Sequence, residues 1–264
     1  ESLPLFSGRS TLEGLYMQSS PSSPFVFYIQ SEISQVGSCP FPHRRCTSFN
    51  IEKGTEHLKL FNVKHFIARS DQVKNALANN TEYKLVYENN PYQVYELISN
   101  ENKYVTIPKY KPLSFPRKNW QERSYELFQT DSDLTVIFDD NPGLIEDMIR
   151  KEPVLVRESI EEKCIINEKI ENEVISFNTN CIGLPHLIKI SYFPEWKVEG
   201  ADKVYLASPS FMLVYPKQED VRLYFGSSVL KKISLILTII GIILIISIKK
   251  WSYLCKIKYL RFFK

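Results

Sequence analysis

The feature that most constrains this chain is an uncharged run of 16 residues, ISLILTIIGIILIISI, at positions 233–248. As an α-helix the run would be about 24 Å long, and starting it at Val229 brings it close to the roughly 30 Å hydrocarbon core of a bilayer. Lysines stand on both sides, and Trp251 and Tyr253 follow as residues typical of a membrane interface. The pattern predicts a transmembrane helix over residues 229–249; a buried core helix or strand is the alternative.

Charge is divided unevenly along the chain. Residues 229–264 contain eight of the 33 basic residues and none of the 30 acidic ones, which leaves residues 1–228 with 25 basic and 30 acidic side chains. Because basic segments tend to stay on the cytoplasmic side of a membrane, we expect a basic cytoplasmic tail at 250–264, lying on membrane lipid, and residues 1–228 outside the cytoplasm. The net charge of +3 is too small to indicate nucleic-acid binding.

The N-terminal sequence, ESLPLFSGRS, has neither a basic segment nor an apolar one. It therefore lacks the pattern of a signal peptide. Because a domain cannot cross a membrane unaided, we expect either a removed signal peptide or further membrane helices before Glu1.

Four of the five cysteines fall in the predicted outer region as two local pairs, Cys39 with Cys46 and Cys164 with Cys181. An oxidising compartment favours disulfides among them, although four cysteines allow three pairings. Four buried free thiols are the alternative. Neither pair has the spacing of zinc ligands, and no metal or cofactor is predicted.

Composition divides the region before the apolar run into three segments. Residues 1–50, rich in Ser and Pro, are predicted to form an extracytoplasmic loop region with a short helix at 25–33, for which a strand is the alternative. Residues 51–150 are predicted to form a small α/β domain. Its expected elements are a strand at 63–68, a helix at 71–79, a hairpin around Asn89-Asn90-Pro91, a helix from Asn119 and an apolar strand, DLTVIF, of the parallel-sheet type.

Residues 151–228 change character and contain eight short β-rich runs separated by turn residues: PVLVRESI, CIINEKIE, EVISFNT, HLIKISYF, WKVEG, KVYLA, FMLVY and VRLYF. Such a series is typical of an antiparallel β-sandwich. The expected fold class is therefore α+β, with a small α/β domain followed by an antiparallel β-sandwich and one C-terminal transmembrane helix.

Catalytic patterns are scarce. The sequence has no phosphate-binding glycine loop, nucleophile elbow or HExxH motif, and its histidines lie far apart at 43, 57, 65 and 186. Acidic pairs occur at 131/133 and at Asp139/Asp140. The second pair could bind a metal or act as acid and base, but a turn before Pro142 is the simpler interpretation. No catalytic residue is predicted.

Aromatic residues gather around the turn at Pro194-Glu195, at positions 192, 193, 196 and 205. Exposed aromatic rings stack on sugars, whereas buried rings hold a sandwich together. Packing is the simpler interpretation. If this chain contacts a glycan, we expect Trp196, Tyr192 and Arg9 to do so.

Several segments resemble one family: ESLPLFSGRSTLEGLYMQSSPSSPFVFYIQSEIS, LKLFNVKHFIARS, YENNPYQVYEL and ISYFPEWKVEGADKVYLASPSFMLVYP. They are similar to the region that follows the membrane-embedded half of large polytopic membrane proteins labelled "6-pyruvoyl-tetrahydropterin synthase-related". The last segment is also similar to C-terminal domains of YfhO-type membrane proteins. The resemblance implies the C-terminal part of a glycosyltransferase-C-like protein that uses lipid-phosphate-linked sugars, with its catalytic acid outside this chain.

From the residues and the resemblance together we expect a non-catalytic region that helps to position a glycan or a polyprenyl-phosphate sugar. Its partners would be membrane lipid and the upstream transmembrane region of the same protein. The alternative is a single-span cell-surface binding protein without enzymatic activity. A self-contained hydrolase would require Asp139 and Asp140 to line a cleft with a third acid.

Overall fold

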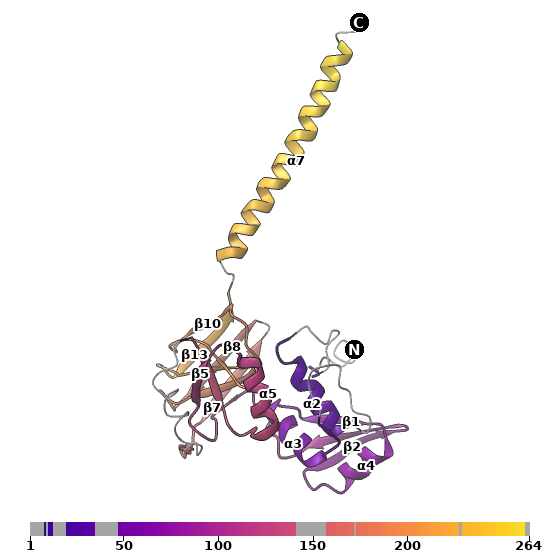
Figure 1. The fold of residues 1–264 in the computed structure, drawn as a ribbon, viewed down its shortest axis with the longest axis vertical. Helices are drawn as coiled ribbons and strands as arrows, with labels where there is room; N and C mark the ends of the chain where they lie inside the picture. Colours follow the sequence, from indigo (N-terminus) through magenta and orange to yellow (C-terminus); the bar gives the residue numbers. More distant parts are fainter. Residues whose placement is uncertain are drawn as a thin grey trace. The chain divides into compact units, whose positions relative to one another are not determined.

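A computed structural model describes residues 8, 10–12, 20–34, 47–140, 157–171, 173–226 and 229–261, with side chains of the last segment described over 232–248. The chain divides into two compact units, Glu1–Tyr224 and Phe225–Lys264. The first is an α+β unit in which the described strands form three sheets (Figure 1). Its described helices are α2 (Ser23–Ile33), α3 (Ile51–Leu60), α4 (Asp71–Ala78) and α5 (Trp120–Thr130).

Helix α3 depends on a close approach to α2. The side chain of Asn50 caps its first turn by accepting a hydrogen bond from the Lys53 N–H at 3.1 Å. Gly54 faces α2, and a Cβ at this position would lie 2.4 Å from the Cγ2 atom of Ile33. Glycine is therefore required where the two helices touch, although glycine weakens a helix considered alone. This helix was absent from the predicted elements.

A small antiparallel sheet follows α3, with its strands in the order β1-β3-β2. The strands are β1 (His65–Ala68), β2 (Tyr83–Asn89) and β3 (Tyr92–Leu97). The turn between β2 and β3 lies at Asn90-Pro91, as predicted. One face of the sheet, which includes Tyr83, Tyr95 and Leu97, is buried in the main core.

The central layer is a six-stranded sheet with the order β4-β9-β12-β11-β6-β5. Its strands are β4 (Val105–Thr106), β5 (Leu113–Pro116), β6 (Val136–Asp139), β9 (His186–Ser191), β11 (Tyr205–Ala207) and β12 (Phe211–Val214). Strands β5 and β6 pair in parallel, and α5 connects them, because parallel neighbours need a crossover. The sheet takes strands from both sides of residue 150, where two domains were expected to meet.

A four-stranded sheet, β10-β13-β8-β7, packs face to face with this central sheet. Its strands are β7 (Ile166–Glu171), β8 (Val174–Thr179), β10 (Trp196–Glu199) and β13 (Asp220–Phe225). Their shared core contains Ile188 and Met212 from the central sheet and Ile175 and Leu223 from the outer one. The β-rich runs from CIINEKIE onward thus form the strands of a sandwich.

Strand β12 shows why its sequence is apolar at every position. Phe211 and Leu213 point into the core on the helical side, while Met212 and Val214 point into the sandwich core. Successive side chains of a strand alternate between faces, so a strand covered on both faces has no polar position. The four-residue run FMLV is buried throughout for this reason.

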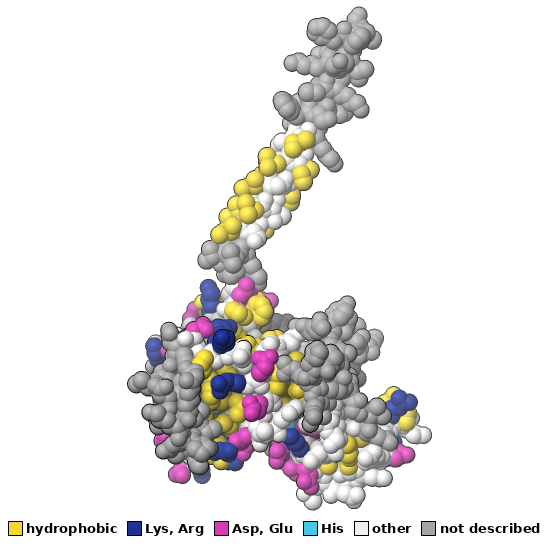
Figure 2. Space-filling model, in the orientation of Figure 1, with side chains coloured by type: hydrophobic (Ala, Val, Ile, Leu, Met, Phe, Trp, Pro, Cys, Tyr) yellow, Lys and Arg dark blue, Asp and Glu magenta, His cyan; other side chains and the backbone are white. Residues whose placement is uncertain are grey.

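The second unit contains α7 (Val229–Arg261). The prediction of a C-terminal transmembrane helix is not supported: in the part of the chain that the structure describes, no helix is both long enough and apolar enough to span a membrane. The uncharged run within α7 has 16 residues, which is about 24 Å at 1.5 Å per residue. The segment is helical as predicted, and its described apolar side chains are exposed (Figure 2).

Candidate functional site

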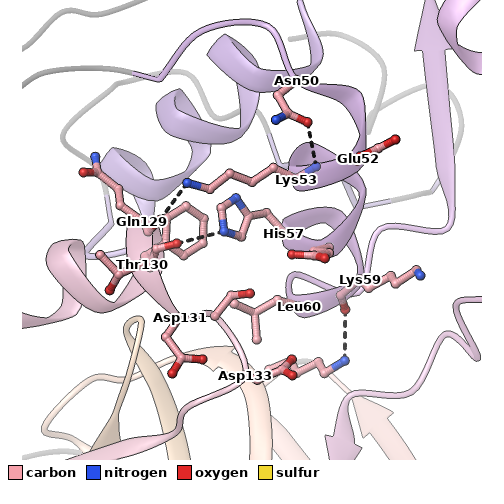
Figure 3. Close-up of a pocket in the computed structure, with 14 residues that line it drawn as sticks. Asn50, Glu52, Lys53, His57, Lys59, Leu60, Gln129, Thr130, Asp131 and Asp133 are labelled. Carbon is pink, nitrogen blue, oxygen red and sulfur yellow. Dashed lines mark hydrogen bonds between the residues drawn. The ribbon is translucent and has the colours of Figure 1, made fainter.

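A pocket of about 750 Å³ lies between α3, the C-terminal end of α5 with the segment that follows it, and β9 (Figure 3). Most of its lining side chains are polar or charged. They are Asn50, Glu52, Lys53, Glu56, His57, Lys59, Leu60, Phe128, Gln129, Thr130, Asp131, Ser132, Asp133 and Lys189. The pocket thus combines residues from helical and sheet layers that are far apart in the sequence.

Two lysines of the pocket are fixed by main-chain carbonyl groups. The Nζ atom of Lys53 donates to the carbonyl oxygen of Gln129 at 2.7 Å, and the Nζ atom of Lys189 donates to that of Lys59 at 3.0 Å. Figure 3 shows Lys53 extending from α3 toward Gln129. These bonds connect α3 to the C-terminal end of α5 and to β9, so they set the width of the pocket.

The acidic groups on the opposite wall are neutralised from outside the pocket. Asp133 accepts a hydrogen bond from the Nζ atom of Lys109 at 2.7 Å, and Asp131 forms an ion pair with Arg157. On α3, Glu52 and Glu56 are exposed one helical turn apart. Charges of both signs are also interspersed on the face of the first unit seen in Figure 2. The pocket therefore has no strong preference for ligands of one charge.

Behind the pocket, α2 and α3 bury an acid–histidine pair. The Oε2 atom of Glu32 lies 2.6 Å from the Nδ1 atom of His57, and the two side chains are 0% and 1% exposed. The Nε2 atom of His57 lies 2.9 Å from the carbonyl oxygen of Phe128, whose ring stacks on the imidazole at 3.7 Å. Because a carbonyl only accepts, Nε2 carries a proton. Glu32 and Nδ1 then share a second proton.

This pair is not arranged for catalysis. In an acid–histidine–nucleophile triad, the ring nitrogen far from the acid takes the proton of the nucleophile. In His57 that nitrogen donates to the carbonyl group of Phe128 instead. The pair fastens α2, α3 and α5 together, and it leaves the Oε1 atom of Glu32 buried without a hydrogen-bond partner.

The second buried histidine, His186, has a different environment. Its Nδ1 atom donates to the carbonyl oxygen of Leu184 at 2.9 Å, and its Nε2 atom accepts from the Thr179 hydroxyl at 2.8 Å. Burial lowers the pKa of His186, because removal from water disfavours the charged ring. This histidine is a neutral component of the sandwich, away from the pocket lining.

The predicted glycan contacts do not meet in the pocket. Trp196 and Tyr192 are half-buried against the sandwich core, and the guanidinium of Arg117 lies 5.5 Å from the centre of the Tyr192 ring. Arg9 lies outside the described residues. The positions of the two aromatic residues agree with the packing interpretation.

The acidic pair lies at the end of β6, where Asp139 is the half-buried last residue of the strand and Asp140 is exposed. Asp139 pairs with the Nζ atom of Lys203 at 2.7 Å, and Asp140 lies 4.0 Å from Arg117. Among the residues described, no three His, Cys, Asp or Glu side chains could hold a metal ion together. Within the described ranges, Asp139 and Asp140 are not among the residues that line the pocket above, and each lies near a basic side chain.

One predicted disulfide is present, between Cys164 and Cys181. It joins the segment before β7 to the segment after β8, and so closes the end of that hairpin. Of the three pairings that four cysteines allow, this is the one in which Cys164 pairs with its neighbour in the sequence. Cys39 and Cys46 lie outside the described residues.

Sequence reasoning missed the pocket because it missed α3. Once this segment is helical, Lys53, His57 and Leu60 recur at the spacing of one helix face. The cap residue Asn50, followed by Glu52 in the first turn, was the available signal. The other wall, at Gln129–Asp133, had no local signal.

Comparison with known proteins gives one match. Residues 1–114 match the model of a family described as a domain of unknown function, DUF8559. The matched segment includes α2, α3 and the three-stranded sheet, and it ends within β5. Nothing among curated proteins matches the chain, and no solved structure matches it. The match thus covers the α3 wall of the pocket, while the wall after α5 lies beyond it.

Proposed function

We propose that this chain is a non-catalytic region of a glycosyltransferase-like protein and that it binds a glycan in the pocket between α3 and the segment after α5. The observation that supports the proposal is the composition of the pocket wall. Amide, hydroxyl, carboxylate and ammonium groups alternate around a space of about 750 Å³, a volume within the usual range of ligand sites.

Sugars suit such a wall because each hydroxyl group both donates and accepts hydrogen bonds. Asn50, Gln129, Thr130 and Ser132 supply uncharged partners, and Glu52 and Glu56 supply exposed acceptors on α3. The Phe128 ring is only 3% exposed and stacks on His57, so it is not a platform for a sugar ring. We therefore expect polar recognition with modest affinity, at micromolar to millimolar concentrations.

The test is a titration of the chain with a panel of neutral and amino-sugar oligosaccharides, followed by calorimetry or by NMR shifts. Glu56→Ala removes an exposed acceptor from the wall and should weaken binding by about tenfold, which corresponds to about 1.4 kcal/mol. Glu126→Ala is the matched control, since Glu126 is an exposed helical glutamate of α5 outside the pocket lining.

Two results would contradict the proposal. One is the absence of binding by every oligosaccharide at millimolar concentration. The other is a site elsewhere: binding unchanged in Glu56→Ala but lost in a folded Trp196→Ala variant would place the glycan at the aromatic residues around Pro194.

A further inference from the structure

Lys189 differs from the other basic groups of the pocket in its surroundings. It projects from β9, an interior strand of the six-stranded sheet, and it is half-buried. Its Nζ atom reaches the pocket lining and donates to the carbonyl oxygen of Lys59 at 3.0 Å. A carbonyl oxygen is a weaker partner for an ammonium ion than a carboxylate is.

The carboxylates that face Lys189 are already engaged. Glu168 on β7 accepts the main-chain N–H groups of Tyr104 and Val105 at 2.9 and 2.6 Å. Glu101, in the loop before β4, pairs with Lys103 at 3.0 Å. On the pocket wall, Asp131 and Asp133 pair with an arginine and a lysine outside the pocket, as described above.

These surroundings favour the uncharged amine. Burial lowers the pKa of Lys189, and the charges of Glu168 and Glu101 oppose this effect only in part. A lysine that is removed from water and has no directly paired carboxylate keeps more of its amine neutral near pH 7. A neutral lysine amine is a nucleophile toward carbonyl carbon atoms.

We propose that Lys189 forms a reversible imine with a carbonyl-bearing ligand in this pocket, of the class of open-chain sugar aldehydes. The inference rests on the proposed function, since the reducing end of a glycan would supply the aldehyde. The polar wall favours a hydroxylated aldehyde over an apolar one of the same size.

The step balances without an oxidant or a reductant. The lone pair of the Lys189 nitrogen attacks the carbonyl carbon, and a carbon–nitrogen bond forms. The carbonyl oxygen then leaves as water together with the two hydrogens that the neutral amine carried. A carbon–nitrogen double bond remains, and water reverses the reaction.

The test uses the chain as it stands with glyceraldehyde as the probe and cyanoborohydride to trap the imine at pH 7. Peptide mass spectrometry then measures the rate at which each lysine is labelled. We expect Lys189 to be labelled about fivefold faster than Lys53, as burial increases the neutral fraction of an amine. Lys53 is the matched control, because it lines the same pocket and also donates to a main-chain carbonyl group.

Propanal provides the control for the ligand class, and it should label Lys189 with less preference than glyceraldehyde does. Lys189→Arg, which replaces the amine by a guanidinium group that stays protonated, should lose the fast label while the rates at the other lysines stay unchanged. Labelling of Lys189 no faster than that of Lys53 in the unmodified chain would overturn the proposal, whatever the variant does.

The two proposals can fail separately. Glycan binding without preferential labelling would overturn the imine alone. Preferential labelling by glyceraldehyde without glycan binding would support the imine chemistry and remove longer glycans as the ligand.

Discussion

The two faces of the six-stranded sheet are covered in different ways. On one face, α2, α3 and α5 pack through an aromatic cluster that encloses the Glu32–His57 pair. On the other, the four-stranded sheet packs over β9 and β12 through mainly aliphatic side chains, and Trp120 and Leu127 of α5 pack near β6 and β11. Burial lowers the pKa of His186 of β9 on this side. The pocket opens on the helical side only.

This difference shows where the chain accepts a cost in stability. An isolated buried carboxylate is expensive, and the unpartnered Oε1 atom of Glu32 shows that the pair is incompletely satisfied. The sandwich contains no comparable group in its described core. We infer that the sandwich is the scaffold and that the helical layer shapes the binding site.

We expect the largest loss of stability when one partner of the buried Glu32–His57 pair is removed. Glu32→Ala leaves His57 without its acid, and it should lower the free energy of unfolding by about 4 kcal/mol, as removal of one partner of a buried pair does. Urea denaturation measures it. The double variant Glu32→Leu/His57→Phe, in which no charge is buried, should be more stable than Glu32→Ala. Equal stability of the single and double variants would contradict the coupling.

A substitution in the sandwich core should lower the free energy of unfolding without changing ligand affinity at the pocket. Met212 is fully buried between the sheets, and Met212→Ala should cost about 3 kcal/mol through loss of buried surface and creation of a cavity. Met212→Leu, which conserves volume, should cost less than about 1.5 kcal/mol. In both variants, ligand affinity at 15 °C should equal that of the unmodified chain. A loss of affinity in folded Met212→Ala would show that the two faces are coupled.

His186 predicts a smaller effect that depends on pH. Because its pKa is lowered in the folded state, the unfolded chain binds a proton below about pH 6.5 that the folded chain does not bind. The corresponding stability is complete above pH 7 and is lost as the pH falls toward the lowered pKa. Between pH 7.5 and 5.5 the unmodified chain should lose more of its free energy of unfolding than His186→Gln does. Parallel curves for the two proteins would exclude this contribution.

We expect the smallest change in stability from substitution of Asp140, the exposed residue that follows β6. Asp140 is exposed and lies 4.0 Å from Arg117, so Asp140→Asn should change the free energy of unfolding by less than about 0.5 kcal/mol. Thermal unfolding of Asp140→Asn and of Asp139→Asn, measured under the same conditions, gives the effect of each substitution. A large loss in Asp140→Asn would show a structural role that a surface turn does not have.

Local sequence patterns predicted the elements that local interactions determine. The apolar run at β12, the Asn–Pro turn of the β2–β3 hairpin and the helix between parallel strands β5 and β6 all follow from patterns within ten to twenty residues. Helix α3 has a local cap signal at Asn50 and Glu52, but Gly54 weakens the helix in isolation and is explained only by contact with Ile33 of α2.

The site depends on distant pairs, which no local pattern contains. Glu32 and His57 are 25 positions apart, and Lys53 and Gln129 are 76 apart. The aromatic residues near Pro194 were visible in the sequence, but Trp196 and Tyr192 pack on the core. Packing was already the simpler interpretation of these rings, and contact with a glycan stays a prediction. How far each ring is buried is decided by the sheets around it, which no local pattern describes.

Residues just before α2 and just after α3 contact the start of β12 and the residue before it, and this has a consequence for synthesis of the chain. The Ser22 hydroxyl lies 2.7 Å from that of Ser210, which is 188 positions later, and Phe61 packs on Phe211 with ring centres 5.0 Å apart. At about 5–20 residues per second, a ribosome needs roughly ten to forty seconds to cover that distance. During this interval Phe61 lacks its partner ring from β12, even after Phe25 can pack on Tyr125 and Phe128. A nascent chain of this protein should therefore bind chaperones until β12 has emerged.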